Sequence, residues 1–109
     1  MQNALEQQGK LFLEAIQAGD AAAVQSMLAA RCQSADVSAL IASRQAAITA
    51  QAGVPIADIT PLTTYVGHFD PGAGEAHTVL EWIADGQRMT LLSADGWLYE
   101  DGQWKNTVC

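Results

Sequence analysis

Hydrophobic residues in the first half of the chain recur at the spacing of α-helices. Leu5, Phe12 and Ile16 fall on one face of a helix. Gly19 suits the left-handed residue that ends a helix, and Asp20 suits the N-cap of the next one. The pattern therefore predicts one helix that ends at Gly19 and a second that begins after Asp20.

A short second helix and a longer third helix are predicted to follow. The second has an apolar side made by Val24, Met27 and Leu28. The third is expected to begin near Ser34 or Asp36 and to end at 53–55, where glycine and proline stop a helix. Its predicted buried stripe is Val37, Leu40, Ile41 and Ile48.

The second half of the chain has the composition of β-strands. Asp85-Gly86 and Asp101-Gly102 lie between apolar runs, which is the strongest local signal for a β-hairpin. Asp95-Gly96 fits either a turn or a β-bulge inside one long bent strand, and we favour the bulge. The predicted strands are 63–69, 78–84, 87–93, 97–100 and 103–108.

A two-residue loop at Asp85-Gly86 fixes which residues face each other. It pairs Trp82 with Met89 and brings Glu81 diagonally close to Arg88. Both faces of this hairpin are then partly apolar. We therefore expect helices to cover one face of the sheet and a second subunit to cover the other, which makes a homodimer the expected assembly.

Composition restricts the partners. The chain has 109 residues, which suits a single domain spanning 1–109, and its net charge is −7. Its few basic residues are scattered, so nucleic acid is an unfavourable partner. No apolar run approaches the roughly 20 residues that span a bilayer, so no membrane insertion is expected.

The two cysteines, Cys32 and Cys109, match no metal-binding spacing. They are either unrelated thiols or one long-range disulfide, worth up to about 4 kcal/mol in the chain-entropy model. A disulfide would place the protein in an oxidising, extracytoplasmic compartment, and free thiols would indicate the cytoplasm.

The order of elements resembles that of the nuclear transport factor 2-like (NTF2-like) superfamily, which shares a cone-shaped α+β fold. Segment 12–24 is similar to that superfamily's first helix, its Gly-Asp break and its second helix, and segment 100–105 is similar to its last hairpin. The two cysteines are similar in position to those of small exported or lipid-anchored actinobacterial domains of this type. The resemblance implies an α+β fold with three N-terminal helices packed on a curved antiparallel sheet around an apolar pocket.

The same superfamily contains isomerases, dehydratases, epoxide hydrolases and non-catalytic binding modules, so the fold does not choose a reaction. The predicted helices contain no tyrosine, so the steroid-isomerase arrangement is not carried over. We expect a non-catalytic module that binds a small apolar ligand or a protein partner, with no cofactor. The alternative is a small acid–base enzyme of hydrolase or isomerase type.

The catalytic candidates for that alternative are Glu81, Arg88 and Tyr65. Glu81 could act as a general base oriented by the Arg88 guanidinium, and Tyr65 could donate a hydrogen bond. A simple ion pair at the sheet rim or across a dimer interface is the favoured interpretation of Glu81 and Arg88.

The ligand-binding candidates are all expected on the inner surface of the cone, between the helices and the curved sheet. They are Arg44, Tyr65, Trp82, Trp97 and Tyr99. For the cluster of Trp97, Tyr99 and Trp104, packing of the sheet on the first helix through Phe12 and Ile16 is the better-supported role. His68 and His77 flank an acidic loop, but their spacing is no recognised metal motif, and no metal is expected.

Overall fold

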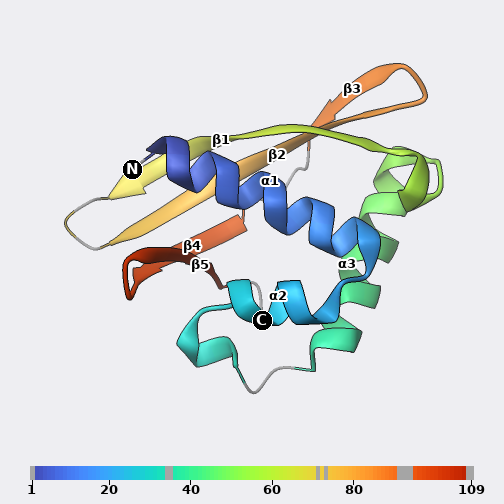
Figure 1. Cartoon of the computed structure of the whole chain (residues 1–109). Coiled ribbons are helices and arrows are strands. Elements are labelled where there is room, and N and C mark those ends of the chain that lie inside the picture. Colours follow the sequence, from blue (N-terminus) through green and yellow to red (C-terminus); the bar gives the residue numbers. More distant parts are fainter. Residues whose placement is uncertain (1, 34–35, 71, 73, 91–94, 108–109) are drawn as a thin grey trace.

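The computed structural model describes residues 2–33, 36–70, 72, 74–90 and 95–107; for 2–3, 61–69, 78–80 and 95 it describes the backbone alone. Three helices come first: α1 (Gln2–Ala18), α2 (Ala21–Met27) and α3 (Val37–Ala52), with short 3₁₀ turns at Ala30–Cys32 and Ile56–Asp58. Antiparallel strands follow and pack against the helices (Figure 1). The predicted α+β class is confirmed.

Local capping explains where the helices begin and end. Gly19 and Gly53 adopt positive φ angles of 68° and 75°, which favour glycine at a helix C-terminus. The carboxylates of Asp20 and Asp36 each accept a 3.1 Å hydrogen bond from the backbone three residues later. The predicted end of the first helix, start of the second and Asp36 start of the third are therefore confirmed, whereas Leu28, predicted within the second helix, is its C-cap.

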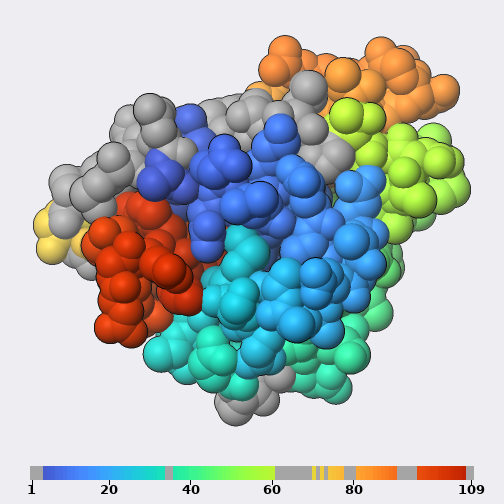
Figure 2. Space-filling model, viewed as in Figure 1, coloured from blue at the N-terminus to red at the C-terminus, as the bar shows by residue number. Residues whose placement is uncertain are grey.

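The sheet has β2 (Glu75–Ala84) near its centre. One edge of β2 pairs with β1 (Thr60–Asp70). Its other edge is shared by β3 (Gln87–Thr90) and β4 (Asp95–Glu100), and β4 pairs in turn with β5 (Gln103–Asn106). The β2–β3 hairpin projects from the body of the molecule (Figures 1 and 2).

The predicted hairpin register is confirmed, but the predicted bulge is in the wrong place. Trp82 pairs with Met89 across β2 and β3. Asp95 and Gly96 pair regularly with consecutive residues of β2, so no bulge lies at this dipeptide. Thr90 and Asp95 are five residues apart, whereas their pairing partners on β2, Glu81 and Thr78, are three residues apart. The register therefore shifts by two residues between the β2–β3 pairing and the β2–β4 pairing. Segment 91–94 lies outside the described residues.

The core lies between α1 and the inner face of the sheet, where α1 runs alongside the strands (Figure 1). Phe12 of α1 meets Trp97 of β4 edge to face, with ring centroids 5.9 Å apart and planes at 78°. Trp82 and Trp104 are also buried, from β2 and β5. The expected packing of the sheet on the first helix is confirmed for these aromatic residues.

The outer edge of β5 is covered by the helical half of the chain. The Ala29 amide donates to the Asn106 carbonyl at 2.8 Å, and Gln8 Nε2 donates to the Trp104 carbonyl at 3.3 Å. Lys105 Nζ donates to the Ser26 carbonyl near the end of α2. The bonds to the Asn106 and Trp104 carbonyls occupy backbone groups of β5 that would otherwise be open to strand addition.

Cys32, in the turn after α2, is 1% exposed and forms a disulfide bond. The sequence contains one other cysteine, Cys109, which lies outside the described residues.

Two adjacent residues of α1 provide a direct test of this core. Phe12→Ala should lower the free energy of unfolding by about 3–5 kcal/mol, because it removes a fully buried ring and leaves a cavity. Leu11→Ala is the matched control and should change it by less than about 0.5 kcal/mol, because Leu11 is 44% exposed. Urea denaturation measures both; equal effects would contradict the packing.

The disulfide makes a second prediction. Reduction should lower the free energy of unfolding by up to about 4 kcal/mol, because it releases a long loop in the unfolded chain. Cys32→Ser should reproduce most of this loss without reductant. Thermal melting with and without reductant measures the effect, and intact mass after thiol alkylation counts free thiols. Two alkylated cysteines in the native, unreduced protein would contradict the bond.

Candidate functional site

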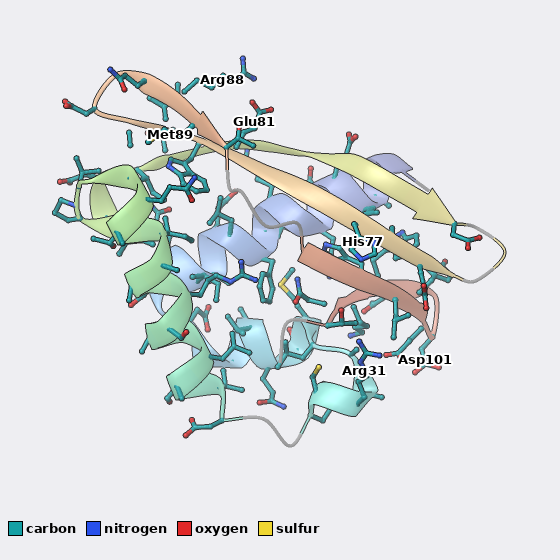
Figure 3. All side chains as sticks on the ribbon, turned by 180° about the vertical axis from the view of Figure 1, so that it is seen from behind. Arg31, His77, Glu81, Arg88, Met89 and Asp101 are labelled. Atoms are coloured by element: carbon teal, nitrogen blue, oxygen red, sulfur yellow. The ribbon has the colours of Figure 1, made fainter. Side chains whose placement is uncertain are left out.

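The Glu81–Arg88 pair forms as the hairpin register predicts. Arg88 Nε donates to Glu81 Oε2 at 2.8 Å, and the two side chains are 64% and 14% exposed, respectively. Figure 3 shows both on the projecting β2–β3 hairpin, with Arg88 at the margin of the molecule. Neither side chain lines the pockets described below. The contact is an ion pair on the sheet, and its catalytic role stays an untested prediction.

The other predicted site residues are dispersed. Trp82 and Trp97 are almost fully buried in the core, and Arg44 is partly exposed on α3. Tyr65 lies on β1 opposite Val79, and its side chain is outside the described part of the structure. Tyr99 differs from the buried tryptophans because it is 43% exposed. Tyr99 lines the larger of the two pockets described below, and Trp97 lines the smaller one.

A pocket of about 410 Å³ lies between the first turns of α1 and the β4–β5 hairpin. Figure 2 shows these two elements side by side on one face of the molecule. The residues that line the pocket are Ala4, Gln8, Tyr99, Gly102, Gln103 and Trp104.

The pocket arises because α1 covers only part of the hairpin's inner face. Trp97 and Tyr99 are two residues apart on β4, so they share one face. Phe12 covers Trp97, and the Gln8 side chain reaches the backbone of β5. One turn nearer the N-terminus, the described lining residue of α1 is Ala4, with its small methyl group, and Tyr99 is 43% exposed.

The aromatic wall of the pocket is held in place by packing. Tyr99 and Trp104 face each other across β4 and β5, with ring centroids 5.1 Å apart and planes at 66°. Their edge-to-face contact fixes the orientation of the exposed Tyr99 ring against the buried indole. The remaining polar lining consists of the Gln8 and Gln103 amides, which hydrogen-bond but carry no charge at any ordinary pH.

A second, polar pocket of about 120 Å³ lies on the other side of β4. Arg31, Glu75, His77 and Thr107 line it together with residues of β2 and β4. Gly96 is required here, because a Cβ atom would approach Thr107 Oγ1 to 2.6 Å. Figure 3 shows His77 and Arg31 on different elements. Among the described residues, no group of three or more His, Cys, Asp or Glu side chains could hold a metal ion.

Sequence reasoning missed most of the 410 Å³ pocket. It named Tyr99 but not Ala4, Gln8 or Gln103. One local signal existed: Ala4 and Gln8 are four residues apart, so they share one face of α1. A second was the Asp101-Gly102 turn, which places Gln103 opposite Glu100 and next to the Tyr99–Trp104 pair.

Comparisons with protein-family models, with curated proteins and with solved structures found no match. None of the helices in the described segments has the length and apolar character needed to cross a bilayer. The site must therefore be interpreted from its own geometry.

The ion pair on the β2–β3 hairpin can be tested with a double-mutant cycle. Glu81→Gln, Arg88→Gln and the double variant should give a coupling energy of about 0.2–1 kcal/mol, because water screens the largely exposed guanidinium. Denaturant unfolding of the four proteins measures it. A coupling of several kcal/mol would show that the pair is a structural element of the core.

Proposed function

We propose that this protein is a non-catalytic module that binds a small, uncharged ligand between α1 and the β4–β5 hairpin. The observation that carries the proposal is the exposed Tyr99 ring, held against Trp104 in a pocket of about 410 Å³. This volume falls within the range of about 300–1,000 Å³ typical of small-molecule sites. Aromatic walls with a few fixed polar groups are also typical of such sites.

The chemistry of the lining favours binding over catalysis. General acid–base catalysis requires a titratable group within hydrogen-bond distance of the reacting proton. Among the residues that the structure describes, no Asp, Glu, His, Lys, Arg or Cys lines this pocket. Glu81 and Arg88 lie on a different hairpin and line neither pocket, so the acid–base alternative has less support.

We also propose that the chain is a distant member of the NTF2-like superfamily. Its three N-terminal helices and the antiparallel strands packed against them support this assignment. A homodimer through the outer face of the sheet stays a prediction. Its support is the partly buried Ile83, which lies opposite Arg88 on the β2–β3 hairpin.

The pocket can be tested with indole as a neutral aromatic probe. Indole should cause saturable shifts of the Gln8 and Gln103 side-chain amide signals in NMR spectra, because both amides line the pocket. Tyr99→Ala should weaken binding by about 2- to 10-fold, through loss of an aromatic contact worth about 0.5–1.5 kcal/mol.

Leu11→Ala is the matched control, because Leu11 is as exposed as Tyr99 but does not line the pocket. It should leave indole binding unchanged. Equal weakening by Tyr99→Ala and Leu11→Ala, or the absence of saturable shifts at the two glutamines, would refute the proposed site.

A further inference from the structure

We infer that the ligand class of this pocket is a neutral saccharide, bound with the C–H face of its ring against Tyr99. The inference rests on the proposed function, since it names the ligand of the same site. Three properties of the described lining residues lead to it: they carry no charged side chain, they include the exposed Tyr99 ring, and they include two amides.

The lining selects an uncharged ligand. A charged ligand would lose hydration on entering a pocket whose described lining residues carry no side-chain charge. Anions are disfavoured further by the net charge of −7. Cations would meet the first turn of α1, where the helix dipole has its positive end.

The Tyr99 ring is suited to one face of a pyranose. Tyr99 is 43% exposed and lines the pocket, and its ring packs against Trp104 at an interplanar angle of 66°. The face of an aromatic ring carries partial negative charge, which attracts the weakly positive C–H groups that line one face of many sugars. A purely apolar ligand would use this surface equally well but would leave the polar lining unpaired.

The two amides supply the partners that hydroxyl groups need. Gln8 donates from Nε2 to the Trp104 carbonyl, which fixes its side chain. Within the described residues, its Oε1 accepts no hydrogen bond, and the exposed Gln103 amide forms none. An amide both donates and accepts, as a hydroxyl does, so two amides beside a ring match the rim of a sugar.

The test uses four neutral probes: methyl β-glucoside, methyl β-galactoside, methyl α-mannoside and N-acetylglucosamine. At least one should cause saturable shifts of the Gln8 and Gln103 side-chain amides in NMR spectra. Glucuronate and choline serve as anionic and cationic comparisons, and each should bind at least about 5-fold more weakly than the best neutral sugar, as expected for an unpaired charge.

Two variants separate the ring from the general shape of the pocket. Tyr99→Ala should weaken sugar binding about 2- to 10-fold, whereas Tyr99→Phe keeps the ring and should stay within about 2-fold of the parent. Ala4→Phe should fill the pocket and abolish binding without lowering the melting temperature, because Ala4 is exposed. Leu11→Ala should have no effect on binding.

The outcomes distinguish failure of the saccharide inference from failure of the proposed function. If indole binds but none of the four sugars does, the saccharide inference is wrong and the binding module stands. Binding of glucuronate or choline as tightly as the best neutral sugar would also overturn it. If neither indole nor any sugar binds, both the inference and the proposed function fall.

Discussion

The structure depends on burial of one aromatic sheet face beneath a single helix. Trp82, Trp97 and Trp104 come from three different strands, and all three are almost fully buried. Burial of each large apolar side chain contributes about 1.5–3 kcal/mol, so these residues strongly favour one register. A slip by one residue would turn Trp97 and Trp104 to the opposite face and expose both. The contact between Phe12 and Trp97 packs α1 against the sheet in this register.

The pocket is a direct consequence of the same packing. The aromatic face of β4 continues from Trp97 to Tyr99, and among the described residues of α1 Phe12 packs on Trp97 while Ala4 and Gln8 line the pocket beside Tyr99. Beyond Gln8, the helix presents Ala4, whose methyl group leaves the neighbouring ring uncovered. The hydrogen bond from Gln8 to the β5 backbone keeps the helix and the hairpin in contact at this point. Core and pocket are therefore two parts of one continuous surface.

Local rules predicted the features that depend on neighbouring residues. Gly19 and Asp20 set a helix boundary through backbone conformation and capping, and the Asp85-Gly86 turn set a register that brings Glu81 to Arg88. The prediction of a bulge at Asp95-Gly96 was wrong. The shift in register comes from the pairing of β3 and β4 with different parts of β2. The approach of Gln8 to Gln103 likewise follows from tertiary packing, since the two are far apart in sequence and no periodicity links them.

The charged Glu81–Arg88 pair and the larger pocket lie in different parts of the structure, and this separation bears on the choice between binding and catalysis. Catalytic sites place ionisable groups inside a cavity, where burial and neighbouring charges tune their pKa values. Here the Glu81–Arg88 pair lies on a projecting hairpin, whereas the larger pocket is lined by rings, amides and small residues. The described residues of this pocket carry no ionised side chain, so what they offer a ligand is shape and hydrogen bonds. Tyr99 therefore offers an exposed ring whose orientation is fixed by packing against the buried Trp104.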